Sequence, residues 1–317
     1  MNLDSIKQAK IDMDKIIRPI YVIESNIETN CHLYLKPENL QYTGSFKLRG
    51  AYNKMLSLTD QEKAKGVIAC SAGNHAQGVA LSAKMMNVKA IICMPASAPK
   101  VKIESTKKLG AEVVLVDGTY DDAYEKALEL QEEYGYTFVH PFNDEKVIEG
   151  QATIGLEILE DLPETDIIIC AVGGGGLISG IAYAAKQIKP GIKVYGVESA
   201  GAPSMYASVA NGYITKLHTV KTFADGIAVK EVGNKTFEYT EKYVDDVLTV
   251  SDVDILETIK TLLMKDKLLA EGAGAAPVTA VLKDIVPGIT PDSNVVCVVS
   301  GGNIDVDALA DIIENGL

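Results

Sequence analysis

The sequence predicts an α/β protein with mostly parallel strands, and three observations support this class. From about residue 66, short runs of apolar and β-branched residues alternate with longer stretches of helical periodicity. The 317 residues are long for one hydrophobic core, which suggests two subdomains. Three of the apolar runs lead directly into loops of glycine and small polar residues, at the strand ends where such sheets bind ligands.

In the first half of the chain, three predicted strands are each followed by a predicted helix. The strands cover residues 66–70, 90–94 and 112–116, and the helices cover residues 75–87, 100–109 and 121–134. The last helix opens with Asp121 and Asp122, which suit the positive end of the helix dipole. This alternation is typical of parallel sheets covered by helices.

The second half of the chain repeats the alternation. Strands are predicted at residues 166–172, 193–197 and 294–299, with helices at residues 177–188 and 252–269. No fixed-period repeat or low-complexity linker interrupts the pattern.

The composition excludes several kinds of protein. A net charge of −13 opposes nucleic-acid binding, which requires a basic face. No segment approaches the roughly 20 apolar residues of a membrane span, and residues 1–17 lack the apolar core of a signal peptide. We therefore predict a cytoplasmic protein. The five cysteines contain no Cys-x-x-Cys pair and the four histidines form no metal-ligand spacing, so we predict free thiols and no metal site.

The strand predicted at residues 166–172 is followed by four consecutive glycines, Gly173, Gly174, Gly175 and Gly176. Without side chains, this backbone can approach a phosphate closely and turn its N–H groups toward it. A P-loop is excluded because no Gly-Lys-Ser/Thr follows. A nicotinamide-cofactor loop is the rival interpretation, since Glu198 lies 22 residues beyond Gly176, about where a ribose-binding acid is expected. That fingerprint fails because Ile178 or Ser179 stands where its third glycine is required.

One lysine, Lys47, is a candidate for covalent chemistry. The preceding Gly44 and Ser45 look like a turn and a helix N-cap, which would place Lys47 in the first turn of a helix. A positive charge there opposes the helix dipole and favours the neutral amine that Schiff-base formation requires. Taken alone, Lys47 is better explained as an exposed surface lysine, so its assignment depends on the surrounding motifs.

Four segments together carry a resemblance to a known family. They are Ser-Phe-Lys-Leu-Arg-Gly at 45–50, Ser-Ala-Gly-Asn-His-Ala-Gln-Gly at 71–78, Gly-Gly-Gly-Gly-Leu at 173–177 and Ser-Gly-Gly-Asn at 300–303. In their order and spacing, the chain from about Arg18 to Asp305 resembles the fold-type-II pyridoxal-phosphate enzymes, and most of all the short, catabolic threonine/serine dehydratases (ammonia-lyases). Serine racemase is a close relative in that group. The resemblance implies two three-layer αβα subdomains with mostly parallel sheets, as in the β subunit of tryptophan synthase.

The resemblance implies cofactor-binding roles for the matching positions. Lys47 would carry pyridoxal 5'-phosphate as a Schiff base and later act as the base at the substrate Cα. Phe46 would flank the cofactor ring, and Asn74 would hydrogen-bond its 3-hydroxyl. Ser300 would face the pyridine nitrogen, and the glycine run with Leu177 would bind the phosphate.

The resemblance also implies a substrate site and an elimination reaction. The substrate carboxylate would be held by the loop of Ser71, Asn74 and His75, largely through backbone N–H groups, so His75 is not expected to act as a general base. A hydroxyl at position 300 cannot keep the pyridine protonated as a carboxylate would, which disfavours transamination and favours loss of a β-hydroxyl. L-Threonine would give 2-oxobutanoate and ammonia, and L-serine would give pyruvate and ammonia.

Three alternatives stay open at the level of sequence. Serine racemases carry a serine immediately before the Gly-Asn pair of the second motif, and Ala72 stands there in this chain, which favours a dehydratase. A nicotinamide-dependent dehydrogenase would use the glycines for pyrophosphate but would leave Lys47 without a role. A non-catalytic amino-acid-binding or scaffold protein would keep the fold and lose the Schiff base.

The expected organisation places the cofactor between two subdomains. A small one, residues 41–140, would carry Lys47 and Asn74, and a larger one, residues 1–40 and 141–317, would bind the phosphate. The chain ends 14 residues after Asn303, so we expect no C-terminal regulatory domain. Resemblance alone implies a small amino-acid substrate as the partner, a homodimer or homotetramer, and AMP as a candidate effector.

Two positions outside the motifs match features of related enzymes, and each has an ordinary structural explanation as well, which for Glu198 is a structural role at the end of its strand. In relatives with a divalent-cation site, acidic residues follow the strand that here ends in Val197; Glu198 is present, but no second acid follows before Ser204. The Asp225–Gly226 pair matches a pocket-lining loop of the family, although Asp-Gly is also common in ordinary turns.

Overall fold

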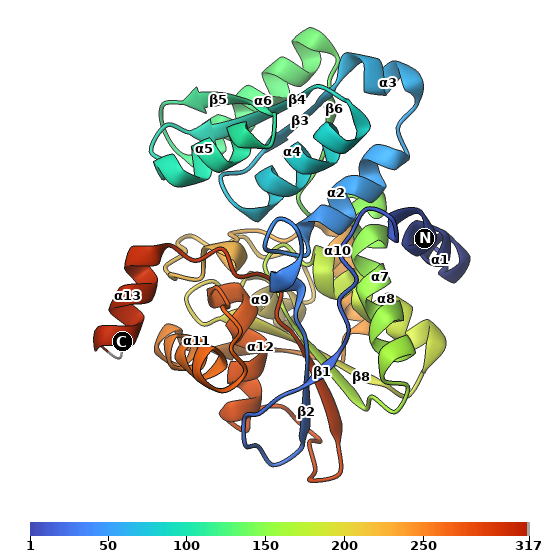
Figure 1. Cartoon of the computed structure of the whole chain (residues 1–317), viewed down its shortest axis with the longest axis vertical. Coiled ribbons are helices and arrows are strands. Elements are labelled where there is room, and N and C mark those ends of the chain that lie inside the picture. The colour runs from blue at the N-terminus through green and yellow to red at the C-terminus, as the bar shows by residue number, and fades with distance from the viewer. Residues whose placement is uncertain (316–317) are drawn as a thin grey trace.

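The computed structural model describes residues 1–315 and consists of two α/β parts, each built on its own sheet (Figure 1). The strands of the smaller sheet are β3 (Val67–Cys70), β4 (Ala90–Pro95), β5 (Glu112–Val116) and β6 (Thr137–Phe138). Those of the larger sheet are β1 (Ile23–Glu24), β2 (His32–Lys36), β7 (Ile167–Ala171), β8 (Lys193–Ser199), β9 (Asp246–Val250) and β10 (Asn294–Val298).

The strand order within each sheet is that of parallel α/β structures. The small sheet runs β5-β4-β3-β6, and the large sheet runs β1-β2-β10-β7-β8-β9. Every pair of neighbouring strands is parallel except β1 with β2, which pair antiparallel at one edge.

Helices cover both faces of each sheet. Those around the small sheet are α2 (Lys47–Leu56), α3 (Asp60–Lys65), α4 (Asn74–Met86), α5 (Lys100–Lys108) and α6 (Tyr120–Tyr134). The others are α1 (Leu3–Met13), α7 (Glu145–Asp161), α8 (Gly176–Ile188), α9 (Ser204–Asn211), α10 (Asn234–Tyr243), α11 (Asp252–Lys265), α12 (Gly272–Leu282) and α13 (Val306–Asn315). Two short 3₁₀ helices complete the set, η1 (Glu38–Leu40) and η2 (Asp225–Ile227).

The buried residues of the strands show why each part has three layers. In β7, Ile167 and Ile169 pack into a core shared with α11 and α12, whereas Ile168 and Cys170 pack into a core on the other face with α7 and α8. Side chains of a strand alternate between the faces of a sheet, so a strand that is apolar at every position must be covered on both sides. The predicted α/β class with two three-layer, mostly parallel parts is therefore confirmed.

Most predicted elements of the first half begin and end within one or two residues of their observed bounds, and the main errors lie elsewhere. The helix predicted at residues 252–269 ends at Lys265, because Lys267 adopts a left-handed conformation with φ +59° and turns the chain toward Leu268. Several elements were not predicted at all, among them β2, β9, α7 and α12. The helix α12 is nearly all small apolar residues and contains Pro277, so it has no amphipathic pattern to reveal it.

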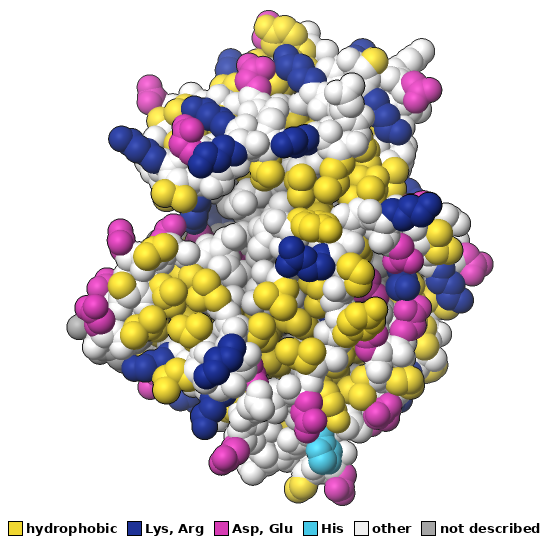
Figure 2. All heavy atoms as spheres, in the orientation of Figure 1, with side chains coloured by type: hydrophobic (Ala, Val, Ile, Leu, Met, Phe, Trp, Pro, Cys, Tyr) yellow, Lys and Arg dark blue, Asp and Glu magenta, His cyan; other side chains and the backbone are white. Residues whose placement is uncertain are grey.

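The helix α2 lies at the junction of the two parts (Figure 1). It packs against α4 on one side and α7 on the other, and glycines permit both approaches. A Cβ on Gly150 of α7 would lie 2.6 Å from the carbonyl oxygen of Arg49, and one on Gly78 of α4 would lie 3.0 Å from that of Lys47. In the space-filling view, the molecule is narrower where the two parts meet (Figure 2). Within the described residues, no helix has the length and apolar character to cross a bilayer.

Candidate active site

Three loops at the carboxyl ends of strands form the candidate site. Residues 71–75 follow β3, residues 173–176 follow β7, and residues 300–303 lie just beyond β10. Strands β7 and β10 are parallel neighbours, so their loops emerge at the same edge of the large sheet. The loop at residues 300–303 also contacts the segment that leads into Lys47. Ser45 and Gly301 form a β-bridge, and the N–H of Phe46 donates to the carbonyl of Ser300 at 3.1 Å.

Lys47 is the first residue of α2, as the sequence predicted. Its Nζ donates a hydrogen bond to the carbonyl of Pro141 at 3.0 Å and lies 5.3 Å from the centre of the Phe46 ring. Burial lowers the pKa of Lys47 to about 8, although the nearby Glu271 carboxylate opposes the shift. The helix dipole also predicted a lowered pKa for Lys47, but desolvation is the main cause of the shift.

The predicted cap of this helix is wrong. Gly44 does form a turn, with φ +70°, but the N-cap is Phe46, and no side chain caps the helix. Ser45 cannot take that role because its backbone is held in the bridge to Gly301. Its buried hydroxyl has no hydrogen-bond partner in the part of the chain that the structure describes.

The glycine run forms a cradle of free donors. Across residues 1–315, none of the backbone N–H groups of Gly173, Gly174, Gly175, Gly176 or Leu177 donates a hydrogen bond to the protein. The first such bond of this segment comes from Ser179, whose N–H reaches the carbonyl of Gly175 at 3.0 Å. Successive unpaired N–H groups at the start of a helix are a strong anion site, so this cradle fits a phosphate group.

The close packing of the cradle explains why it has no side chains. A Cβ on Gly174 would overlap the ring of Phe142, and Gly175 has φ +90°, a conformation that favours glycine. The back of the cradle is fixed by Thr236, whose hydroxyl donates to the carbonyl of Gly174 at 2.6 Å. Leu177 is buried in the core beneath, in the first turn of α8.

The loop after β3 offers a second set of free donors. The N–H groups of Ala72, Asn74 and His75 have no acceptor within residues 1–315, whereas that of Gly73 is bound by the Ser71 hydroxyl at 3.2 Å. His75 is buried, and its Nε2 lies 2.8 Å from the carbonyl of Val139. Burial and the charge of Lys47 lower the pKa of His75 to about 3, so its ring stays neutral. These contacts give the His75 side chain a structural role, while the backbone N–H groups of Ala72, Asn74 and His75 stay free.

The side chain of Asn74 points away from that loop into the large part. Its Nδ2 donates to Oε1 of Glu271 at 2.6 Å, and its Oδ1 accepts from Nδ2 of Asn303 at 2.7 Å. Glu271 is 4% exposed, and its Oε2 accepts the N–H of Asn303 at 3.0 Å. Burial and the negative charge of Asp225 raise the pKa of Glu271 to about 7.

Sequence reasoning missed Glu271 and Asn303 as parts of this site. Glu271 was detectable, because it is a single acidic residue between Leu268–Ala270 and a run of glycines and alanines. A lone carboxylate in such surroundings is expected either to have a partner or to be functional. Asn303 belongs to the Ser-Gly-Gly-Asn segment at 300–303, but its sequence context does not indicate a role for its side chain.

Ser300 lies two residues beyond the end of β10 and is 2% exposed. Its carbonyl accepts the N–H of Phe46, which brings the residue next to Lys47 along the backbone. The ring of Phe46 is partly buried and packs against the core of the large part. The assignments of Ser300 to a ring nitrogen and of Phe46 to a ring face stay predictions.

Glu198 has a structural role at the end of β8. It is fully buried and accepts the N–H groups of Met205 at 2.9 Å and Tyr206 at 2.7 Å, and so caps α9. Burial raises its pKa to about 7. Because Glu198 is fully buried beneath the start of α9, its carboxyl group is not exposed to a ribose, which argues against the nicotinamide interpretation. No group of three or more metal-ligating side chains occurs within residues 1–315.

The loop that contains Asp225 and Gly226 adjoins the cradle, as predicted. A Cβ on Gly173 would lie 3.1 Å from Cα of Ile227, and one on Gly226 would lie 3.2 Å from Oε1 of Glu271. Asp225 is also bound across the junction by Lys102 of α5, with 2.6 Å between Nζ and Oδ2.

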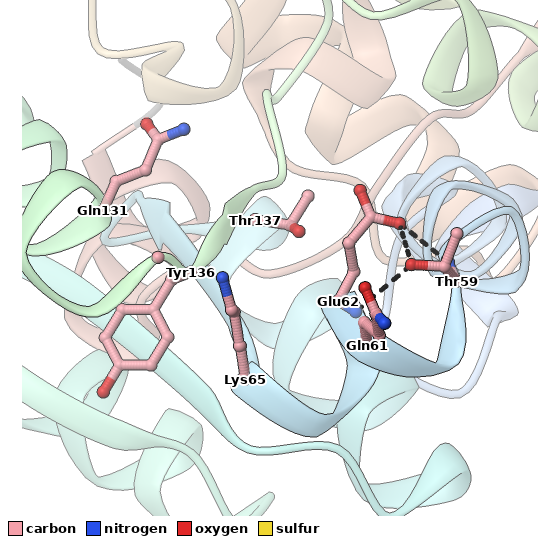
Figure 3. A pocket seen from close by; sticks show the side chains of 8 residues that line it. Thr59, Gln61, Glu62, Lys65, Gln131, Tyr136 and Thr137 are labelled. Atoms are coloured by element: carbon pink, nitrogen blue, oxygen red, sulfur yellow. Dashed lines mark hydrogen bonds between the residues drawn. The ribbon is translucent and has the colours of Figure 1, made fainter.

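A separate hollow lies on the small part, away from the residues of the candidate site (Figure 3). It is lined by side chains of α3, α6 and the segment before β6, including Thr59, Glu62, Lys65 and Tyr136. None of the residues that form the candidate site lines it.

A buried amine of lowered pKa, a cradle of free N–H groups that fits a phosphate, and a second loop with free N–H groups are together typical of enzymes that bind a phosphorylated carbonyl cofactor through a lysine. The chain belongs to the pyridoxal-phosphate-dependent enzyme family, whose sequence model matches residues 17–301. The predicted cofactor, pyridoxal 5'-phosphate, is therefore confirmed.

Individual relatives are similar along nearly the whole chain. L-Threonine ammonia-lyase of Thermotoga maritima is 48% identical over 321 residues, which cover 100% of this chain and 79% of the relative. The catabolic L-threonine dehydratase TdcB of Escherichia coli K12 is 47% identical over 280 residues, covering 88% and 85%. Among solved structures, a tomato threonine deaminase has a TM-score of 0.87 at 39% identity, covering 99% and 89%. Maize serine racemase has a TM-score of 0.92 at 35% identity, covering 99% and 97%.

Proposed function

We propose that this chain is an L-threonine ammonia-lyase, which converts L-threonine to 2-oxobutanoate and ammonia and L-serine to pyruvate and ammonia. One observation carries the proposal: the buried Lys47 amine lies beside two loops that carry free backbone N–H groups. It donates to the carbonyl of Pro141, the residue before the Phe142 ring that packs on Gly174, and its charge adds to burial in lowering the pKa of His75 in the loop after β3. An amino-acid substrate and a phosphorylated cofactor each supply one anion for these sites. The relatives named above as threonine ammonia-lyase and threonine dehydratase support the reaction.

The cofactor would be held by residues of both parts. The cradle at residues 173–177 would bind its phosphate, Phe46 would lie against its ring, Asn74 would bind its 3-oxygen, and Ser300 would face its nitrogen. When bound, pyridoxal phosphate supplies the electron delocalisation that makes the Cα proton of the substrate acidic.

The protein's own groups then bind and deprotonate the substrate. The free N–H groups of Ala72, Asn74 and His75 hold the substrate carboxylate, which orients the Cα–H bond. Lys47 Nζ takes the Cα proton, because burial keeps much of this amine neutral near pH 8. His75 and His140 are weak bases, since burial first and the charge of Lys47 second lower their pKa values to about 3 and about 4.

The racemase alternative needs a second base on the opposite face of Cα. Ala72 cannot provide one, and the hydroxyl of Ser71 accepts the N–H of Gly73 at 3.2 Å. We therefore expect L-serine to give pyruvate without comparable formation of D-serine. Accumulation of D-serine at a rate close to that of pyruvate would favour a racemase.

The central test is the replacement Lys47→Ala. Borohydride should fix the cofactor to Lys47 in the unaltered protein, as peptide mass spectrometry will show, and Lys47→Ala should lose both the label and the release of oxo acid. Lys108→Ala is the matched control, since Lys108 is exposed near the end of α5. Unchanged turnover in Lys47→Ala would refute the proposal, and rates with L-threonine and L-serine would establish the preferred substrate.

Several further properties belong to the proposal. We infer a cytoplasmic enzyme, a homodimer or homotetramer, and AMP as an effector; sedimentation and rate measurements with and without AMP test the last two. We also propose that residues 41–140 form the small subdomain and that residues 1–40 with 141–317 form the large one. The separation of the two sheets supports this division.

A further inference from the structure

We propose that Glu271 is a positioning residue that fixes which end of the Asn74 amide faces the cofactor. Glu271 lies just before α12 in the large part, and Asn74 is the first residue of α4 in the small part. This inference rests on the proposed function, because it gives Glu271 a task in the same site.

While Glu271 is ionised, the hydrogen bonds around Asn74 permit only one orientation of its amide. An ionised carboxylate can only accept, so Glu271 Oε1 at 2.6 Å must face the Asn74 Nδ2 group. On the other side, Nδ2 of Asn303 can only donate, so it must face the Asn74 Oδ1 atom at 2.7 Å. In a flipped amide, Asn74 Oδ1 would face the Glu271 carboxylate, where both groups accept, and Asn74 Nδ2 would face Asn303 Nδ2, where both groups donate. The second hydrogen of Asn74 Nδ2 is thereby left free to donate to the 3-oxygen of the cofactor.

The two orienting groups are themselves held in place. Asn303 Nδ2 also donates to the carbonyl of Thr43 at 2.8 Å, and the N–H of Asn303 donates to Glu271 Oε2 at 3.0 Å. The backbone N–H of Glu271 donates to the carbonyl of Gly301 at 3.0 Å. Glu271, Asn74 and Asn303 therefore form one connected network, and it ties the substrate loop of the small part to the loop beyond β10.

The network should respond to pH. Both protein groups that reach the Glu271 oxygens are N–H donors, so protonation of the carboxyl would remove one acceptor from this arrangement. Three charged groups face it: Lys47 from α2, Lys102 from α5 and Asp225 from η2. Burial and Asp225 favour the protonated form, whereas the two N–H donors and Lys102 favour the carboxylate.

The replacement Glu271→Gln tests the proposal. Glutamine has one accepting oxygen in place of two, so one of its two N–H contacts is lost. We expect the pH midpoint of the visible absorbance of the bound cofactor to shift, and kcat for L-threonine to fall between about 10-fold and 100-fold, the range for loss of one hydrogen bond to a charged group. KM should change less than kcat, because the backbone N–H groups that bind the carboxylate are retained.

Glu149→Gln is a matched control. Glu149 is also 4% exposed and also accepts a hydrogen bond from an asparagine, Asn53 at 3.2 Å, but this pair lies between α2 and α7 and outside the site. We expect its spectrum and kcat to match those of the unaltered enzyme. If Glu271→Gln does not fold, Asn303→Ala removes the second orienting group and should shift the same absorbance midpoint.

The outcomes separate this proposal from the proposed reaction. An unaltered spectrum and kcat in a folded Glu271→Gln variant would overturn the positioning role. A shifted spectrum in a protein that releases no oxo acid from threonine or serine would retain the positioning role and refute the proposed substrates.

Discussion

At the scale of single residues, the glycines of the cradle are set by contacts that the sequence cannot show. Gly174 faces the ring of Phe142, and Phe142 follows Pro141, the acceptor of the Lys47 amine. His140 holds this short segment in place, since its Nδ1 accepts the N–H groups of Phe142 at 3.2 Å and Asn143 at 2.8 Å. The lysine and the phosphate cradle therefore share one supporting segment.

The replacement Gly174→Ala should weaken cofactor binding. Its methyl group would overlap the Phe142 ring, and overpacking of this kind costs about 1–3 kcal/mol, which corresponds to a rise of the dissociation constant of about 5-fold to 150-fold. A fluorescence titration of the apoprotein with pyridoxal phosphate measures this dissociation constant. Gly191→Ala is the control, because no atom lies within 4 Å of a Cβ at that position. Equal affinity of the two variants would contradict the tight fit at residue 174.

At the scale of elements, a buried charge network anchors the helix that begins at Lys47. Arg49 is fully buried and makes a two-pronged contact to Glu38, at 2.9 Å and 2.8 Å, and reaches Glu157 of α7 at 2.6 Å. Lys36 of β2 lies 2.8 Å from the same Glu157. Burial would raise the pKa of Glu157, but the charges of Arg49 and Lys36 hold it at about 2. The start of α2 is thus fixed to the large part.

Breaking this network should destabilise the protein strongly. Arg49→Met leaves the buried Glu38 and the partly buried Glu157 without their main partner, and removal of one member of a buried ion pair costs about 3–5 kcal/mol. Lys126→Met is the comparison, since the pair of Lys126 with Glu129 is exposed and such pairs contribute less than about 1 kcal/mol. Urea unfolding measures both free energies. Similar losses in the two variants would show that the Arg49 network does not anchor α2.

At the scale of the whole molecule, buried acids and buried histidines have opposite effects on stability. The pKa values of His75 and His140 are lowered from 6.5 to about 3 and about 4, so the unfolded chain binds more protons than the folded one below pH 6.5. Acidification then favours unfolding. The pKa values of Glu198 and Glu271 are raised from 4.5 to about 7, so between pH 4.5 and 7 the folded chain binds the extra protons. Acidification in that window favours folding.

Between pH 5.5 and 6.5 these two effects oppose each other in the unaltered protein. In Glu198→Gln, the folded chain no longer binds a proton at residue 198, so one of the two groups that stabilise the fold on acidification is lost. Both histidines are retained. One bound proton changes the free energy of unfolding by about 1.4 kcal/mol per pH unit. When the pH is lowered, the free energy of unfolding of Glu198→Gln should therefore fall more steeply than that of the unaltered protein, by about 1 kcal/mol per pH unit. Urea titrations at the two pH values measure the difference. Parallel pH dependences would contradict the raised pKa of Glu198.

The sequence by itself determined the class of fold and the chemistry that the chain can hold. Apolar strands alternating with helices specify covered parallel sheets, and the motifs around Lys47, Asn74, Gly173 and Ser300 identify the family, because both signals are local in the chain. Tertiary structure alone decided the helix α12, which has no amphipathic pattern, the capping role of Glu198, and the contact of Glu271 with Asn74, which are 197 residues apart. Contacts over such separations depend on how the two sheets meet, and burial, which sets the protonation of Lys47 and Glu271, exists only once they have met.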